Sequence, residues 1–191
     1  MKRLLLIGAM CFSCDFAGAS DNVTNGAAWR RPFTLSLHLD KTHIYETEVS
    51  QLPYVNGDDV YLVAGDRFGI RTKVVDGKII AIAYEPDTDK ADIHFRFTQE
   101  PTDGGDYMMY LVVQSRHAKT VYVDALMVRP NKDDMRSTTM LPLTPRIPNC
   151  EGWPHPITQL VLRHFRFETK SQNNTSDGIR QPADGLPKPS R

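Results

Sequence analysis

The sequence predicts an all-β protein, because large apolar residues recur at every second position over much of the chain. Residues 33–39 and 93–97 each place apolar side chains on one face of an extended strand and polar ones on the other. No stretch carries the apolar spacing of a helix of three turns. Gly, Pro and Asp separate these runs, which is typical of short antiparallel strands joined by turns.

A hairpin is predicted around Asp76-Gly77, which stands between two β-branched runs. Asp-Gly is the sequence expected of a two-residue type I′ turn, so Val75 should oppose Lys78 and Val74 should oppose Ile79. An uninterrupted register then gives two faces. The expected core face carries Ile70, Thr72, Val74, Ile79, Ala81 and Ala83, and the half-covered face carries Arg71, Lys73, Ile80, Ile82 and Tyr84.

Residues 106–114 and 120–128 are apolar on nearly both faces, as is expected of central strands covered on two sides. The polar link 115–119 favours a hairpin between them. With 60–63 and 160–167 as further strands, the domain should hold about eight to ten strands.

Five prolines between Pro142 and Pro156 predict a stiff crossing loop in place of a paired strand, because proline fixes φ and lacks a backbone donor. The last strand should begin near Ile157. A β-bulge between Leu162 and Phe165 is expected, since it restores Phe165 and Phe167 to one face.

These elements predict one antiparallel β-sandwich domain of immunoglobulin-like type at residues 32–168. Residues 20–31 are polar apart from Trp29 and predict a flexible N-terminal segment. Residues 169–191 are rich in amides, Pro and Gly and predict a disordered polar C-terminal tail.

Residues 1–19 have the three parts of an export signal: two basic residues, an apolar stretch over 4–12, and small residues ending at Ala19. Cleavage after Ala19 would make the protein periplasmic or secreted. The apolar stretch is too short for a transmembrane helix. The alternative is a membrane-anchored lipoprotein acylated at Cys14, although Cys11 stands where such signals usually have leucine.

The net charge argues against one class of partner, and the cysteine content limits the disulfides that the chain could form. Loss of residues 1–19 would leave a net charge of −1 with no basic stripe, which argues against a nucleic-acid partner. Cys150 would then be the single remaining cysteine, so no internal disulfide could form.

Cys150 is the sharpest catalytic candidate, with His155 five residues on and Asp124 or Glu151 as possible orienting acids. A nucleophilic thiolate needs a helix N-terminus or a packed imidazole, whereas the flanking prolines hold this segment extended. We therefore expect no catalytic residue here. A hydrolase with carboxylates from distant strands is the least favoured alternative.

Metal binding is also a weak expectation. A two-residue turn at Asp40-Lys41 would set His38 across from His43, but Asp-Lys is a poor turn of that kind. The acidic loops lack the spacing of a calcium-binding loop. The sequence predicts no metal and no cofactor.

The favoured function is therefore a non-enzymatic exported protein that binds another protein, such as an envelope assembly factor or a toxin inhibitor. Tryptophan and arginine dominate binding hot spots, so the candidate binding residues are Trp29, Arg30, Trp153 and His155. Packing of Trp153 over the end of the sandwich is an equal alternative for that residue. A carbohydrate-binding module, with a glycan stacked on exposed aromatic rings, is the alternative function.

Overall fold

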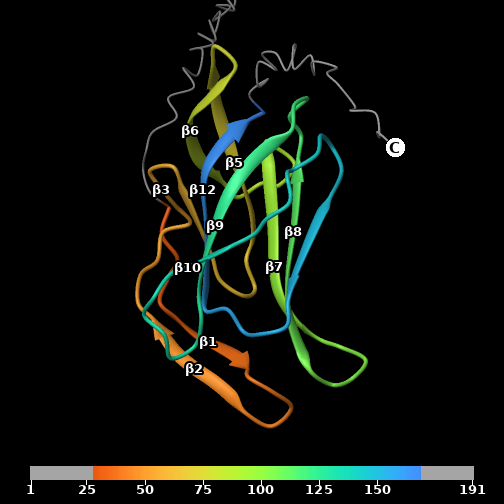
Figure 1. Cartoon of the computed structure of the whole chain (residues 1–191). Helices are drawn as coiled ribbons and strands as arrows, with labels where there is room; N and C mark the ends of the chain where they lie inside the picture. The colour runs from red at the N-terminus through yellow and green to blue at the C-terminus, as the bar shows by residue number, and fades with distance from the viewer. Residues whose placement is uncertain (1–27, 169–191) are drawn as a thin grey trace, which may run out of the picture.

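The computed structural model describes residues 28–168, and this range holds twelve β-strands and no helix (Figure 1). No helix in this part of the chain is therefore long and apolar enough to cross a membrane. The predicted signal peptide, the lipid-anchor candidate Cys14 and the predicted tail 169–191 lie outside the described residues. The strands are β1 (Phe33–His38), β2 (Ile44–Val49), β3 (Val55–Asn56), β4 (Asp59–Leu62), β5 (Arg67–Val75), β6 (Lys78–Glu85), β7 (Ile93–Pro101), β8 (Tyr107–Ser115), β9 (Val121–Val128), β10 (Arg136–Thr138), β11 (Asn149–Trp153) and β12 (Gln159–Phe167).

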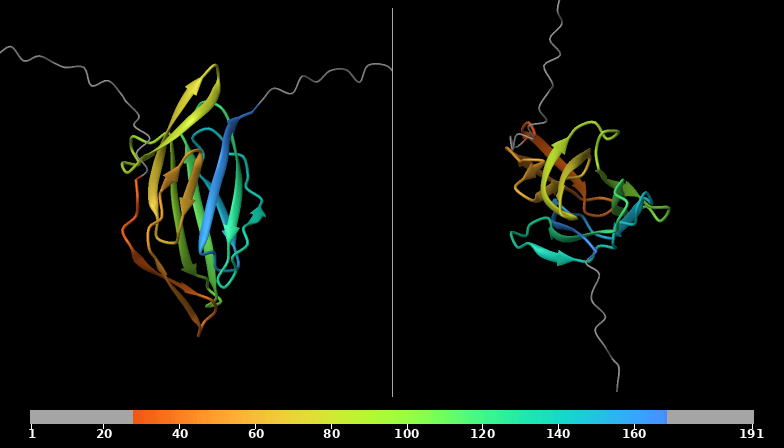
Figure 2. Two further views of the ribbon diagram at one scale, coloured as in Figure 1. Left: turned by 90° about the vertical axis from the view of Figure 1, so that its left-hand side faces the viewer. Right: turned by 90° about the horizontal axis from the view of Figure 1, so that it is seen from above.

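The strands form two five-stranded antiparallel sheets and a separate hairpin. We call the sheet with order β10-β9-β12-β4-β3 the β12 sheet, and the sheet with order β11-β8-β7-β5-β6 the β7 sheet. The view from above in Figure 2 shows them as two layers. This confirms the predicted antiparallel sandwich and is consistent with the immunoglobulin-like type.

The core lies between the two sheets and is rich in aromatic side chains. Phe68, Phe95 and Phe97 of the β7 sheet are each no more than 1% exposed. Phe95 packs edge-on against Phe165 of the β12 sheet, with ring centroids 6.5 Å apart. Burial of each such ring removes about 150–250 Å² of surface from water and contributes roughly 1.5–3 kcal/mol, so within residues 28–168 the inward-facing aromatics hold the layers together without a disulfide.

The β1–β2 hairpin closes one end of the sandwich. Leu35 and Leu37 are buried as predicted, whereas Leu39 is exposed. The Asp40 carboxylate accepts the backbone N–H groups of Thr42 and His43, which shapes a longer loop than a two-residue turn. His38 therefore pairs with Ile44 and does not face His43.

The predicted hairpin between residues 106–114 and 120–128 is wrong. The corresponding strands lie in opposite sheets, because β8 pairs with β7 and β11 while β9 pairs with β12 and β10. The link between them crosses from one layer to the other. Residues on its two sides form isolated bridges to one loop, Ser115 with Pro145 and Val121 with Leu143. A short polar link suits a turn and a layer crossing equally, so the sequence could not distinguish them.

The β5–β6 hairpin has the predicted turn, with Val75 opposite Lys78 and Val74 opposite Ile79. A bulge follows at once, since Lys73 pairs with Ala81 and Ile80 is the extra residue. The bulge reverses the two faces that the sequence predicted for β6 beyond Ile80. Ile82, and not Ala81, opposes Thr72 and is 4% exposed.

The crossing loop predicted before β12 is also partly wrong, because residues 149–153 form the paired edge strand β11. Pro148 and Pro154 stand just outside its ends, where a missing donor disturbs no pairing. The predicted bulge in β12 is confirmed by a register shift between Arg163 and Arg166, with His164 at φ 55°.

Candidate binding groove between β6 and β12

Only one of the four predicted binding residues is well exposed. Trp153 is 7% exposed, packs edge-on against Phe97 and donates its indole N–H to Thr138 at 3.0 Å. The structure therefore favours packing over the end of the sandwich for this residue. His155 is half-buried, and burial, followed by the nearby Arg129 charge, lowers its imidazole pKa.

Arg30 is buried, so its expected place on the surface is wrong. Its Nε and Nη2 donate to the two carboxylate oxygens of Asp66 at 3.2 and 2.6 Å. The remaining N–H groups donate to the backbone carbonyls of Leu52, Pro53 and Tyr61. All N–H donors of this guanidinium are used within the domain, so Arg30 has a structural role. The folded domain therefore begins before Pro32.

Trp29 is 55% exposed, although its backbone bridges Pro53. No hydrogen bond or ring contact in the described residues joins Trp29 and Arg30 to Trp153 and His155. The predicted residues therefore do not form one site.

The groups considered for catalysis and metal binding are not assembled. Cys150 is exposed on edge strand β11. Asp124 instead contacts His164 and Arg166, each at 2.9 Å, and the hydrogen bond from His164 is the main reason that the Asp124 pKa is lowered. Within residues 28–168, no group of three or more His, Cys, Asp or Glu side chains is placed to hold a metal ion.

A recess in the described residues lies instead between the distal parts of β6 and β12. One edge of β12 is paired with β9 along its length, but the other pairs with β4 only at residues 160–162. Residues 163–167 therefore have a free edge on the β4 side. Such an edge presents unpaired backbone N–H and C=O groups to whatever lies beside it.

Strand β6 forms the opposite wall. It pairs with β5 on one side and is the last strand of its sheet on the other. Beyond Ile70, β5 has no pairing to β7, so the outer half of the β5–β6 hairpin projects past the sheet toward β12. Figure 1 shows this hairpin and the end of β12 at the same end of the sandwich.

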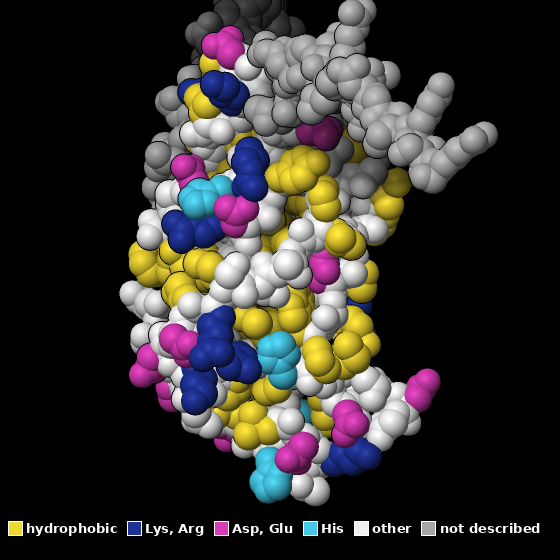
Figure 3. All heavy atoms as spheres, viewed as in Figure 1, with side chains coloured by type: hydrophobic (Ala, Val, Ile, Leu, Met, Phe, Trp, Pro, Cys, Tyr) yellow, Lys and Arg dark blue, Asp and Glu magenta, His cyan; other side chains and the backbone are white. Residues whose placement is uncertain are grey.

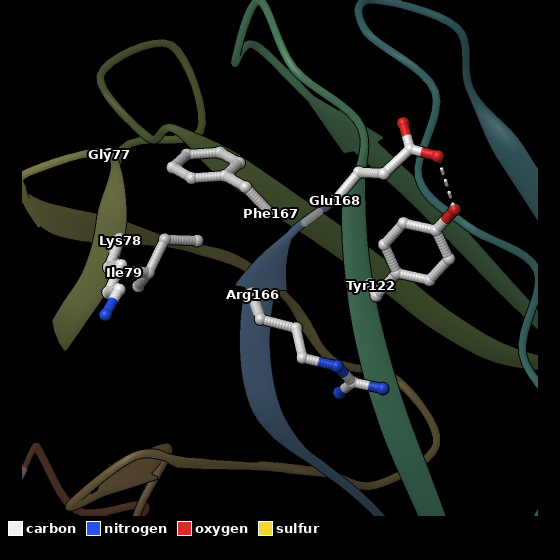
Figure 4. A pocket seen from close by; sticks show the side chains of 7 residues that line it. All are labelled: Gly77, Lys78, Ile79, Tyr122, Arg166, Phe167 and Glu168. Carbon is white, nitrogen blue, oxygen red and sulfur yellow. Dashed lines mark hydrogen bonds between the residues drawn. The ribbon is translucent and has the colours of Figure 1, made fainter. Parts of the chain in front are cut away.

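Two neighbouring hollows of about 470 and 210 Å³ fill the space between these walls. We call the combined space the β6–β12 groove. Figure 4 shows Ile79 and Phe167 pointing toward the same space, while Glu168 turns away and accepts a hydrogen bond from Tyr122. The smaller hollow reaches down to Asp58 in the turn between β3 and β4 and is also lined by Ile79, Ala81, Ile82, His164, Phe165 and Arg166.

Two lysines lie near the hairpin-turn end of the groove, where the carboxylates of Asp76 and Glu168 are also found. Lys119 lies 5.6 Å from the Phe167 ring centroid, and Lys78 lines the hollow beside Ile79. Neither lysine forms an ion pair in residues 28–168. Arg166, in contrast, is paired with Asp124.

A hydrogen-bonded chain supports the wall behind Phe167. His117 packs edge-on against the Phe167 ring at 5.0 Å, and its Nε2 lies 3.0 Å from the Thr72 hydroxyl. The Asp92 carboxylate accepts the Thr72 backbone N–H at 2.7 Å. These contacts fix β5 at the level where it leaves the sheet. Burial of His117 lowers its imidazole pKa.

Sequence reasoning missed this groove, although it located both walls. The alternation of Phe165 and Phe167 and the Asp76-Gly77 turn were visible. The place where β4 stops pairing with β12 was not, because strand pairing is a tertiary property. On the face seen in Figure 3, apolar side chains gather toward the right-hand side, while Lys and Arg side chains lie mostly on the left and at the lower end.

Comparison of the chain with models of protein families, with curated proteins and with solved structures finds no match.

Proposed function

We propose that this protein is an exported, non-enzymatic module that binds another protein through the β6–β12 groove. The observation that carries the proposal is that a free strand edge, residues 163–167, opens onto a groove with half-buried apolar side chains. Free edges and apolar recesses are the two features that proteins use to capture extended segments of other proteins. Apolar and charged side chains line the groove together, a mixture that is common in protein-binding sites.

Photo-crosslinking from the groove tests this function. A photoreactive amino acid placed at Ile79 should yield a specific adduct in cells that produce the protein natively, identified by mass spectrometry. Ile44 is the matched control, because it is also an isoleucine in a β-strand, is 54% exposed, and lies on the β1–β2 hairpin. The same adduct from both positions, or none from Ile79, would count against the groove as the binding site.

Export is a separate part of the proposal and has its own test. A signal over residues 1–19 implies a mature chain that begins at Ser20, and intact mass of the protein from its native envelope fraction reads this directly. A mass increase that matches acyl chains on Cys14 would instead identify a membrane-anchored lipoprotein.

A carbohydrate-binding module is the second candidate, and the exposed ring of Trp29 favours it. Indole faces stack on sugar rings in many glycan sites, but Trp153 is buried and cannot contribute a second platform. Retention on a glycan array that disappears in the Trp29→Ala protein would support this function over protein binding.

A further inference from the structure

We propose that two copies of this chain associate through strand β11, which pairs antiparallel with the same strand of the second copy about a two-fold axis at Cys150. The pairing joins the two β7 sheets into one continuous sheet. This surface goes beyond the proposed function, because β11 and the groove strand β6 are at opposite ends of the β7 sheet. The dimer therefore leaves both grooves open.

The outer edge of β11 is open. It is the last strand of its sheet, and within residues 28–168 only β8 packs closely along it among the strands. Figure 1 shows β11, in light blue, as the outermost strand on the right of the view. The preceding loop is held by side chains on the core-facing side of β11, since Glu151 accepts the Leu141 N–H at 2.7 Å and Asn149 donates to the Leu141 carbonyl at 3.2 Å.

Several other edges have features that prevent pairing, whereas β11 has few. Strand β3 has two residues and β10 has three, and β6 packs toward β12 and β3. Antiparallel self-pairing of β2 centred on Glu46 or Thr47 would set glutamates opposite each other, because Glu46 and Glu48 share its exposed face. Short strands and charges protect edges in this way. Strand β11 instead presents the uncharged Cys150 and Gly152 on its exposed face.

The sequence of β11 favours one register for self-pairing. A two-fold axis at Cys150 places this residue opposite Cys150 of the second copy and places Asn149, an uncharged amide, opposite Glu151. An axis at Glu151 would instead oppose two carboxylates, which is unfavourable. Arg146 and Glu151 are the charged residues in the segment 144–154, so two such segments bring no net charge together.

Two exposed apolar side chains flank this edge. Leu141 is 62% exposed and is held beside β11, and Ile147 is 59% exposed and lies two residues before the strand. On the same side of the molecule, apolar side chains gather in Figure 3. A second β11 strand would remove part of this surface from water. Pro148 and Pro154 limit the pairing to a short segment, so we expect a weak dimer in reducing buffer.

The register brings two thiols to the separation that a disulfide requires. Directly opposed residues of antiparallel strands have Cα atoms about 4.5–5.5 Å apart. A disulfide spans roughly 4.4–6.8 Å between Cα atoms. The two copies of Gly152 would be offset by about four residues, or roughly 13 Å along the strands. A thiol at position 150 should therefore cross-link, and a thiol at position 152 should not.

Oxidation of the mature protein, residues 20–191, by diamide tests this register. Cys150 is its single thiol, and diamide takes up the two hydrogen atoms that are released when two thiols form a disulfide. The controls combine Cys150→Ser with Gly152→Cys, on the same exposed face, or with Ser36→Cys, at an exposed position of β1. Each rate is divided by the rate of alkylation by iodoacetamide, which corrects for thiol reactivity. Wild-type protein should form the linked dimer at least about tenfold faster than either control. Equal corrected rates would overturn the register.

Association without the disulfide needs its own measurement. In reducing buffer, sedimentation velocity should show a monomer–dimer equilibrium, and hydrogen exchange at residues 149–153 should slow as the concentration rises. Ile147→Lys should raise the dimer Kd at least about tenfold, whereas Ile44→Lys, at a 54% exposed isoleucine of the β1–β2 hairpin, should change it less than about twofold. A monomer at concentrations up to about 100 μM, or a dimer in which residues 149–153 stay unprotected, would overturn the proposal.

The native protein distinguishes a second copy from another protein. Electrophoresis without reductant, followed by mass spectrometry of linked peptides, should recover the Cys150 peptide joined to itself. A Cys150 peptide joined only to a different protein would replace the second copy as the occupant of this edge.

Discussion

Arg30 and Asp66 form a two-point ion pair, with Nη2 2.6 Å from Oδ2 and Nε 3.2 Å from Oδ1. The guanidinium also lies over the Tyr54 ring, with Cζ 4.0 Å from its centroid. Asp66 in turn accepts the backbone N–H of Val63 at 2.7 Å. This pair joins the first described residues of the domain to the loop between β4 and β5.

Replacement of Arg30 by Met should lower the free energy of unfolding by about 3–5 kcal/mol, because it leaves a buried carboxylate without its partner. Chemical denaturation followed by tryptophan fluorescence measures this change. Arg31→Met is the control, since Arg31 is exposed and its substitution should cost less than about 0.5 kcal/mol. Loss of partner binding from Arg30→Met with unchanged stability would restore Arg30 as a binding residue.

Trp153→Ala should cost about 3–5 kcal/mol, because the side chain is buried against Phe97 and its removal opens a cavity. Trp153→Phe should recover part of this loss but not the hydrogen bond to Thr138. Trp29→Ala offers the same chemical change at an exposed site and should cost less than about 1 kcal/mol. Equal costs at the two positions would contradict the burial assigned to Trp153.

Gly69→Ala should destabilise the domain by about 1–3 kcal/mol through overpacking. The Cβ added at Gly69 would clash with the Ala91 Cβ and would lie 2.9 Å from the Ile93 carbonyl oxygen. Gly104→Ala is a matched change, because its nearest neighbour would be the Thr102 hydroxyl at 3.7 Å. Thermal melting of the two variants checks the prediction, and Ala91→Gly should partly rescue Gly69→Ala.

Stability should fall as the pH decreases below about 6.5, the usual histidine value. Burial lowers the pKa of His117, His94 and His155 in the folded state, so the unfolded chain binds protons first. The stabilisation that each of these histidines contributes is fully present above its pKa in the unfolded chain. It is lost as the pH falls toward the lower pKa that the same histidine has in the folded state. For His117, Asp92 opposes the lowering by favouring the charged imidazole.

His117→Gln isolates one contribution to this dependence. Unfolding free energies measured between about pH 8 and pH 5 should show a smaller slope in this variant than in the wild-type protein. A slope unaltered by His117→Gln would mean that this residue does not titrate differently in the two states.

The sequence predicted local structure best where a single physical rule decided it. The Asp76-Gly77 turn was correct because a type I′ turn needs residues that tolerate positive φ, and Asp76 and Gly77 have φ of 50° and 72°. The β12 bulge was correct because Phe165 and Phe167 had to share a face. The faces of β6 were wrong beyond Ile80, since a bulge in an otherwise regular hairpin reverses the parity and leaves no composition signal.

By itself, the sequence determined that this chain is an antiparallel β-sandwich, because period-two alternation and turn residues are local properties. The tertiary structure decided which strands pair, that Arg30 and Trp153 are buried, and that 106–114 and 120–128 lie in opposite sheets. It also decided where β4 stops pairing with β12, and hence where the groove lies. Pairing and burial depend on contacts between residues far apart in the chain, and such contacts have no period or motif in the sequence.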